Sequence, residues 1–302
     1  MSEVLVAGGT GFIGSSVVRR LVERGDRVRV MTSRPGRSAD RIRAAGAEPV
    51  EGDVLRPETL AAAVAGADVV VQSLTFPTFP VEKPKRRYTF EEFEHHGTQR
   101  LVDAAKAAGA KRFVYVSGVG VAPDAPKVWH RAKWAGERAI LASGVPATII
   151  RPSWVYGERD NSLNRFVTMA RLSPVVVQLG FRAQRINPVW VEDVANVVSR
   201  AATVDAPSGI FEIGGPQVLT MAQVLRTMLD VMGKRRLVLP IPAAAPKAIG
   251  LIAQFLPKPP LSPSAVDFAT GDAVADTADL LVKFPMRLTP LREGLATYLA
   301  ER

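Results

Sequence analysis

The first residues of the chain place a glycine-rich turn between an apolar, strand-like run and an amphipathic helical pattern. The apolar run ends at Ala7, and glycines follow at positions 8, 11 and 14. This spacing, G-x-x-G-x-x-G, is a variant of the G-x-G-x-x-G fingerprint of dinucleotide-binding proteins. Gly8 permits a sharp turn out of the strand, Gly11 permits close approach of a pyrophosphate, and Gly14 permits close packing of helix on strand. The turn therefore predicts a phosphate site at the start of the helix; the alternative is a turn that serves packing alone.

Strand-like and helical patterns alternate through the first half of the chain, which is typical of a parallel sheet with helices on both faces. The sequence therefore predicts an α/β fold with a Rossmann-type, doubly wound parallel sheet. Beyond Gly215 the chain becomes richer in proline, and its apolar residues recur at helical spacing, which predicts a smaller, mostly helical region on the substrate side. We expect a dinucleotide-binding core over 1–157, a substrate-side insertion over 158–184, a return to the core sheet over 185–215 and a C-terminal helical cap over 216–302.

The loop after the second predicted strand, residues 27–31, indicates which nicotinamide cofactor the chain binds. NAD-binding sites usually place an acidic residue here for the ribose 2′-hydroxyl, whereas NADP-binding sites place arginine for the 2′-phosphate. Residues 32–37 hold two arginines and no acid. A guanidinium binds phosphate through two hydrogen bonds, and a carboxylate would repel it. We therefore expect NADP(H) rather than NAD(H), with Arg34 as the main contact and Ser33 and Arg37 beside it; the alternative is a solvated loop.

Two further loops should line the cofactor groove, because each follows a predicted strand of the same sheet. Asp53 and Val54 follow the third strand, where a Rossmann fold places the adenine. Ser73, Leu74 and Thr75 follow the fourth strand and should form the floor of the groove. The contacts expected from the glycine-rich turn are Gly8, Thr10, Gly11, Phe12, Ile13 and Gly14.

A helix is predicted over about 90–108, and it carries the adjacent histidines His95 and His96. Neighbouring residues of an α-helix point about 100° apart. Two such side chains make a poor chelate. We therefore expect no metal site in this protein.

Composition narrows the classes of partner. The chain has no cysteine, which excludes disulfides and thiolate chemistry. Its net charge of +10 is spread over scattered basic residues, so we expect no nucleic-acid partner. No signal peptide is visible, and we expect a cytoplasmic protein. The apolar segment 243–256 is too short and too interrupted to span a bilayer. A peripheral membrane contact or a protein-complex contact through it stays open, as does the choice between monomer and homodimer.

Five motifs together resemble one family, the extended or atypical short-chain dehydrogenases/reductases of the NAD(P)-binding Rossmann superfamily. The motifs are G-G-T-G-F-I-G at 8–14, G-D-V at 52–54, F-V-Y-V-S at 113–117, R-P-S-W-V-Y-G at 151–157 and V-E-D-V-A at 191–195. The resemblance covers roughly residues 1–220 and is specific as a set. The rest of the chain resembles the branch that includes the nucleotide-binding accessory subunit of respiratory complex I and the NmrA-like proteins.

The resemblance implies catalytic roles for two residues and also reveals a departure. In the family a serine on the fifth strand orients a carbonyl, and a Tyr-x-x-x-Lys pair on the next helix delivers a proton. The lysine also binds the ribose of the cofactor and lowers the pKa of the tyrosine, so the resemblance implies a cofactor contact from this position as well. Ser117 and Lys133 match the serine and the lysine, but Trp129 stands where the tyrosine is expected. An indole donates a hydrogen bond and does not act as an acid at neutral pH. Loss of a general acid typically costs about 10²- to 10⁴-fold in rate.

Three explanations stay open for the missing tyrosine. His130, three residues before Lys133, donates the proton instead. A tyrosine from elsewhere, Tyr156 or Tyr88, reaches the site. Or no acid is needed, because the hydride goes to a conjugated or quinone-like acceptor and water completes the reaction. The resemblance also implies nicotinamide contacts from three residues after the sixth strand: Pro152, Ser153 and Val155.

The sequence thus leads to a first hypothesis and two alternatives. The first is an NADPH-dependent oxidoreductase that acts on a small, apolar carbonyl or conjugated substrate. The second is a non-catalytic NADPH-binding protein, with a structural or sensing role like that of the complex I accessory subunit. The third, a nucleotide-sugar epimerase or dehydratase, ranks last because it also needs the tyrosine.

Overall fold

The computed structural model describes residues 1–179, 184–241 and 271–300, and it divides into two compact units. The first, here the sheet unit, comprises Met1–Pro152, Val191–Ile213 and Asp276–Met286. The second unit comprises Ser153–Trp190, Gly214–Ala275 and Arg287–Arg302. Residues 276–286 thus belong to the sheet unit, although the sequence pattern groups all of 216–302 in one cap.

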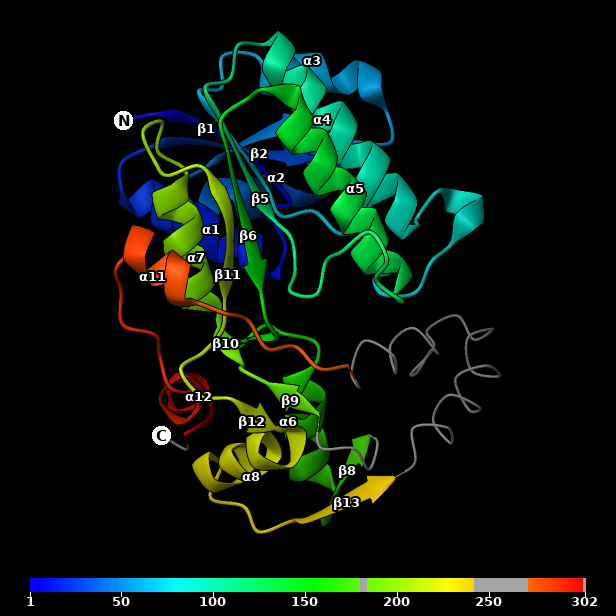
Figure 1. The fold of residues 1–302 in the computed structure, drawn as a ribbon, viewed down its shortest axis with the longest axis vertical. Helices are drawn as coiled ribbons and strands as arrows, with labels where there is room; N and C mark the ends of the chain where they lie inside the picture. Colours follow the sequence, from blue (N-terminus) through cyan, green and yellow to red (C-terminus); the bar gives the residue numbers. More distant parts are fainter. Residues whose placement is uncertain (180–183, 242–270, 301–302) are drawn as a thin grey trace. The chain divides into compact units, whose positions relative to one another are not determined.

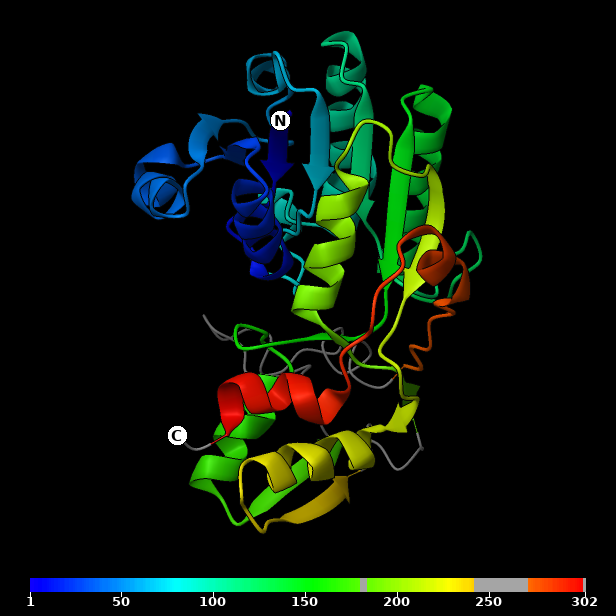
Figure 2. The same cartoon turned by 90° about the vertical axis from the view of Figure 1, so that its left-hand side faces the viewer.

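The sheet unit is built on seven parallel strands in the order β11-β6-β5-β4-β1-β2-β3. The order reverses at β1, with β2 and β3 on one side and β4, β5, β6 and β11 on the other. Figures 1 and 2 show helices on both faces of this sheet. This confirms the predicted doubly wound Rossmann-type α/β fold. The strands are β1 (Glu3–Ala7), β2 (Arg27–Thr32), β3 (Glu48–Glu51), β4 (Val69–Gln72), β5 (Arg112–Val116), β6 (Ala147–Pro152) and β11 (Gly209–Ile213).

The helices form two layers. Helices α1 and α7 pack together on one face, and α3, α4 and α5 lie on the other (Figures 1 and 2). The helical elements are α1 (Phe12–Glu23), α2 (Pro35–Ala44), η1 (Pro57–Thr59), α3 (Leu60–Val64), η2 (Pro84–Arg86), η3 (Glu91–His96), α4 (Gly97–Ala107), α5 (Val128–Ser143), α7 (Val191–Ala201) and α11 (Ala278–Lys283).

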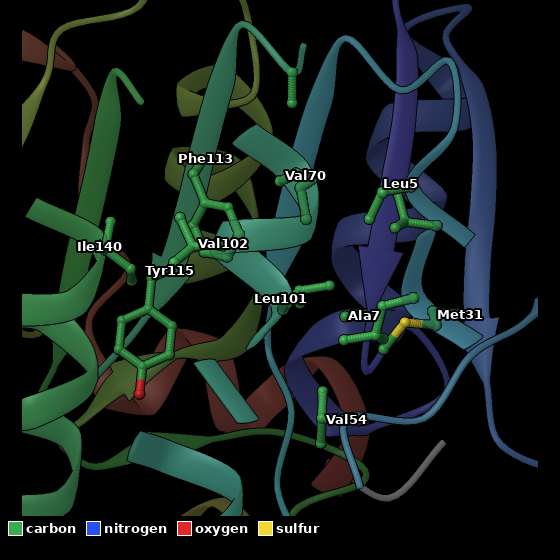
Figure 3. Packing of buried hydrophobic residues seen from close by; sticks show 14 of the residues in the cluster. Leu5, Ala7, Met31, Val54, Val70, Leu101, Val102, Phe113, Tyr115 and Ile140 are labelled. Carbon is green, nitrogen blue, oxygen red and sulfur yellow. The ribbon is translucent and has the colours of Figure 1, made fainter. Parts of the chain in front are cut away.

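The core follows from the burial of both sheet faces. All residues of β4 and β5 are buried, as expected for central strands of a parallel sheet with helices on each side. Figure 3 shows Leu5, Val70 and Phe113 of the sheet in one buried apolar cluster with Leu101 of α4 and Ile140 of α5. Apolar burial of this kind stabilises by about 25 cal/mol per Å².

The predicted helix over 90–108 is in fact two elements. Residues 91–96 form the π-helix η3, and the α-helix α4 begins at Gly97. The close packing of α5 against η3 accompanies this wider turn. A Cβ added to Gly136 of α5 would lie 2.1 Å from the carbonyl oxygen of Glu94, so only glycine permits this backbone contact. A Cβ on Gly97 would similarly lie 2.9 Å from the Glu92 oxygen.

The second unit combines short strand pairs with helices around its own apolar cluster. The pairs are β7 with β10, β9 with β12 and β8 with β13, and α8 packs against α12. The elements are β7 (Val155–Tyr156), α6 (Leu163–Leu172), β8 (Val175–Leu179), β9 (Arg185–Ile186), β10 (Val189–Trp190), β12 (Leu219–Thr220), α8 (Met221–Val231), β13 (Leu237–Ile241) and α12 (Leu291–Leu299).

The apolar segment 243–256 that the sequence singles out lies outside the described residues. Among the residues that are described, no helix combines the length and the apolar character that a membrane crossing requires.

We predict that Gly136→Ala destabilises the protein by roughly 1–3 kcal/mol, the usual cost of overpacking. The new methyl group would meet a backbone oxygen that cannot move without disturbing η3. Gly36→Ala is the matched control, since Gly36 is also helical and a Cβ there meets nothing within 4 Å. The control should be neutral or stabilising by up to about 1 kcal/mol. Urea unfolding followed by circular dichroism compares the two, and equal stabilities would contradict the packing argument.

Candidate functional site

The glycine-rich turn joins β1 to α1 at the carboxyl edge of the sheet. Gly8 adopts a φ of +89°, and a Cβ there would lie 2.3 Å from the carbonyl oxygen of Ser73. A Cβ on Gly14 would lie 2.2 Å from the oxygen of Gly8. The amide of Gly11 donates to the same oxygen at 2.9 Å. The first and third glycines are thus required by close backbone contacts, and the exposed Gly11 leaves the turn open to solvent.

Helix α1 begins at this turn without a side-chain cap. Gly11 occupies the capping position, and the first turn contains no acidic residue. The first amide groups of a helix have no partner within the helix, and they lie at the positive end of its dipole. Such a terminus favours an anionic ligand. Thr10, Phe12 and Ile13 are half-buried around it.

Arginines of the β2–α2 region lie on the same edge. Ser33, Arg34 and Arg37 are all exposed, and within the described ranges neither guanidinium enters an ion pair. Arg41, one helical turn beyond Arg37, donates from Nη2 to the carbonyl oxygen of Thr10 at 3.0 Å. Arg41 is not among the contacts predicted from the sequence. Its i, i+4 spacing from Arg37 was the available signal, because such residues share one helix face.

The two other predicted cofactor loops also lie at carboxyl ends of strands. Asp53 is half-buried, and its carboxylate accepts from the amide of Leu55 at 2.9 Å. Val54 is buried. The amide of Ser73 donates to the oxygen of Ala7 at 2.8 Å, which carries the pairing of β1 and β4 up to the glycine turn. Leu74 is half-buried and Thr75 is exposed.

The predicted serine is held by a buried carboxylate. Ser117 follows β5, and its hydroxyl donates to Oε1 of Glu137 at 2.5 Å. Arg151 of β6 donates from Nε and Nη2 to the two oxygens of the same carboxylate, at 2.9 and 2.5 Å. Glu137 is only 1% exposed. The three side chains form a closed, charge-compensated group that fixes the direction of the Ser117 hydroxyl.

The predicted lysine is held by a second buried carboxylate. The ammonium of Lys133 donates to Oε2 of Glu94 at 2.8 Å, and the hydroxyl of Tyr115 donates to the same oxygen at 2.9 Å. Glu94 is fully buried, whereas the lysine side chain keeps 14% exposure. Burial and the neighbouring Glu94 raise the pKa of Tyr115 well above its ordinary value, so Tyr115 stays a neutral hydrogen-bond donor.

Glu94 is not among the site residues predicted from the sequence. An acidic residue directly after Phe93 and seven residues before Leu101, both buried, was the signal in the pattern. A charged residue on an apolar helix face requires a partner.

The helix α5 contains the two residues that bear on the missing tyrosine. Trp129 is 7% exposed, and its ring lies 5.8 Å from that of Phe90, as in ordinary core packing. Burial, with the charges of Lys127 and Lys133, lowers the pKa of His130 to about 4. The imidazole is therefore uncharged at neutral pH and carries no readily released proton.

The remaining predicted residues divide between the units. Pro152 ends β6 in the sheet unit. Ser153, Val155 and Tyr156 belong to the second unit, where the Ser153 hydroxyl donates to the carbonyl oxygen of Ala273 at 2.5 Å. Tyr156 is fully buried in the apolar cluster of that unit. In the sheet unit, Tyr88 is half-buried and packs on an aromatic ring of η3.

We predict that Lys133→Met destabilises the protein by roughly 3–5 kcal/mol, because it leaves the carboxylate of Glu94 buried without its cation. The double variant Glu94→Gln/Lys133→Met should recover part of this loss, with a coupling energy of about 0.5–3 kcal/mol. Urea unfolding of the wild type, both single variants and the double variant gives this energy. Strictly additive effects would show that the two side chains do not depend on each other.

Comparisons with known proteins support a nicotinamide cofactor for this protein. A family model described as NAD(P)H-binding matches residues 8–204. The Arabidopsis thaliana mitochondrial protein named NADH dehydrogenase (ubiquinone) 1 alpha subcomplex subunit 9 is 30% identical over 290 residues, which are 92% of this chain and 70% of that protein. The NAD(P)H azoreductase of Xenophilus azovorans is 30% identical over 234 residues, 76% of this chain and 74% of that protein.

Solved structures show the same fold. The crystal structure of gox2253 superposes with a TM-score of 0.76 at 22% identity and covers 98% of this chain and 96% of its own. The Bordetella bronchiseptica enzyme WbmH, solved with NAD⁺, gives 0.71 at 20% identity and covers 99% and 98%. This chain belongs to the NAD(P)H-binding family, which agrees with the resemblance of its motifs to the extended short-chain dehydrogenases/reductases of the Rossmann superfamily.

Proposed function

We propose that this protein binds NADP(H) at the carboxyl edge of its seven-stranded sheet and uses it as an oxidoreductase on a small, apolar substrate. The observation that carries the cofactor proposal is an arginine row, Arg34 at the start of α2 with Arg37 and Arg41 on the helix, beside the uncapped start of α1. Arg34 and Arg37 are exposed without ion pairs among the described residues, and Arg41 touches the glycine turn. A 2′-phosphate supplies the anion that such a row favours.

The reaction we propose is hydride transfer to a conjugated, quinone-like or azo acceptor. The hydride brings two electrons and one proton, and the second proton comes from water. Three arguments support this choice. Trp129 is not an acid, the pKa of Tyr115 is raised, and His130 is uncharged at neutral pH. A simple carbonyl needs a positioned proton donor, and none of these side chains supplies one.

In this proposal Lys133 keeps the role that the family resemblance gives it, as a ligand of the nicotinamide ribose. An ammonium has three donors. One goes to Glu94, and a second contact lies 3.5 Å away at the carbonyl oxygen of Val116. The remaining capacity suits a ribose hydroxyl. Because Glu94 balances its charge, Lys133 positions the nucleotide without making the site strongly cationic.

A second function is favoured by the same departure from the family. Trp129 packs as a core residue, and Ser117 and Lys133 are both held in buried polar groups. A bound NADP(H) in such a site has a structural or sensing role, and a partner protein then reads its presence. The Arabidopsis relative is named as a subunit of a larger complex. Under this alternative the protein retains nucleotide through purification and oxidises none of it.

We predict that Arg34→Ala weakens NADPH binding by roughly 1.5–3 kcal/mol, the scale of a hydrogen bond to a charged group. NADH lacks the 2′-phosphate, so its affinity should hardly change. Arg43→Ala is the matched control, because Arg43 is an exposed arginine of the same helix that pairs with Asp40. Calorimetry measures the affinities of the wild type, Arg34→Ala and Arg43→Ala for NADPH and for NADH. Equal losses for NADPH and NADH in Arg34→Ala would remove this residue from the 2′-phosphate site.

We also predict that the protein oxidises NADPH with quinones or azo dyes and not with simple ketones. Trp129→Phe should leave this turnover within about tenfold, below the 10²-fold loss typical of a removed general acid. Single-turnover absorbance at the NADPH band follows the reaction. Reduction of ketones, or a 10²-fold or larger loss in Trp129→Phe, would contradict the proposed route of the proton. Tight nucleotide binding without oxidation by any acceptor would favour the structural alternative.

A further inference from the structure

The outer face of the π-helix η3 brings three side chains with metal-binding groups together. Glu91, His95 and His96 each offer one ligand atom, and these atoms lie within 4.8 Å of one another. Oε1 of Glu91 lies 2.6 Å from Nδ1 of His95 and 3.7 Å from Nε2 of His96. The two imidazole rings stack with their centroids 4.4 Å apart. This cluster has no part in the cofactor proposal.

The π-helical backbone is the reason that all three side chains meet. In an α-helix, residues four apart share a face, so Glu91 would contact His95 while His96 pointed away. Hydrogen bonds from i to i+5 widen the turn. Residues at i+4 and i+5 then both return to the side of residue i, which here is Glu91. The expectation that neighbouring histidines cannot chelate was based on α-helical spacing, and it does not apply to this turn.

The backbone of this turn is held from its inner side. The carbonyl oxygen of Glu94 packs against Gly136, and the Glu94 carboxylate pairs with Lys133. Phe93 is buried. A metal site on a rigid scaffold loses little entropy on binding. The ligand side chains themselves are free to adjust, because Glu91 is 55%, His96 45% and His95 32% exposed.

We propose that Glu91, His95 and His96 bind one divalent first-row transition-metal ion, with Zn²⁺ as the best match. Two imidazole nitrogens and one carboxylate oxygen are a usual set for a three-ligand zinc site, with water in the fourth position. Zinc bonds to these atoms are about 2.0–2.2 Å long. Small rotations of the exposed side chains would bring the ligand atoms to that distance from one ion.

The neighbouring charges limit the number of protein ligands to three. Glu92, the next acidic residue, pairs with Arg87 at 2.8 Å and with Arg100 at 3.2 Å. It is therefore engaged and does not serve as a fourth ligand. The site has one negative charge and two neutral donors, so a divalent ion keeps a net positive charge there and retains solvent ligands. This favours nitrogen-preferring ions such as Zn²⁺, Ni²⁺ and Co²⁺ over Mg²⁺ and Ca²⁺.

The chain contains three histidines, and the third is a built-in control. His130 lies on α5 beside Trp129 and has no part in the cluster. The experiment uses full-length protein without an affinity tag and titrates Zn²⁺ by calorimetry. We expect one site per chain. Glu91→Gln and His96→Ala should each lower the affinity by roughly tenfold or more, the scale seen when groups that support a metal site are removed. His130→Gln should leave the affinity unchanged.

Nuclear magnetic resonance of the wild type provides a second measurement that needs no variant. Addition of paramagnetic Co²⁺ should broaden the ring signals of His95 and His96 at concentrations that leave His130 sharp, and excess Mg²⁺ should not reverse this. Any one of three results would overturn the proposal: no zinc binding, equal broadening of all three histidines, or an unchanged affinity in both cluster variants. A folded circular dichroism spectrum for each variant excludes loss of structure as the cause of weaker binding.

Discussion

The packing of α5 against the π-helix η3 is the constraint on which the position of Lys133 in the sheet unit depends. Gly136 allows the two backbones to touch, and the Glu94–Lys133 ion pair crosses the same contact. A buried charge without its partner costs several kcal/mol, so each side chain holds the other in place. The position of the lysine is thus decided by η3, a segment nearly forty residues earlier in the chain.

A second buried carboxylate acts in the same way on the serine. Glu137 binds the Ser117 hydroxyl and the Arg151 guanidinium, and both groups that the family uses for chemistry are therefore fixed by acids. Trp129 stands in the place of the tyrosine, and an indole is not an acid at neutral pH. Under the proposed function, Lys133 orients the nucleotide and the second proton comes from water. Hydride transfer to a conjugated acceptor and retention of the cofactor for a structural purpose both agree with this arrangement. The two functions share the nucleotide site and differ only in whether the bound cofactor gives up its hydride.

Local sequence signals predicted the parts of the protein that depend on short stretches of chain. The glycine spacing predicted the β1–α1 turn, and the close contacts of Gly8 and Gly14 are those that its roles require. Alternating strand and helix patterns predicted the doubly wound sheet, and the motif set predicted the family. The predicted contacts of the cofactor and the preference for NADP(H) stay predictions. Both concern a bound nucleotide, and the binding experiments with NADPH and NADH test them.

The sequence by itself determined the alternation of strands and helices along the chain, the family and the absence of the usual tyrosine, because each depends on residues that are close together in the chain. Only the tertiary structure decided which groups surround Ser117 and Lys133. Glu94, Glu137 and Arg41 make their contacts through packing between separate elements. Local spacing could single out Glu94 and Arg41 on a helix face, but it could not name the groups that they contact. The same holds for the turn at Glu91–His96. Its residues have ordinary helix preferences, and it is the backbone contact with Gly136, brought in by α5, that accompanies the wider π-helical hydrogen bonding.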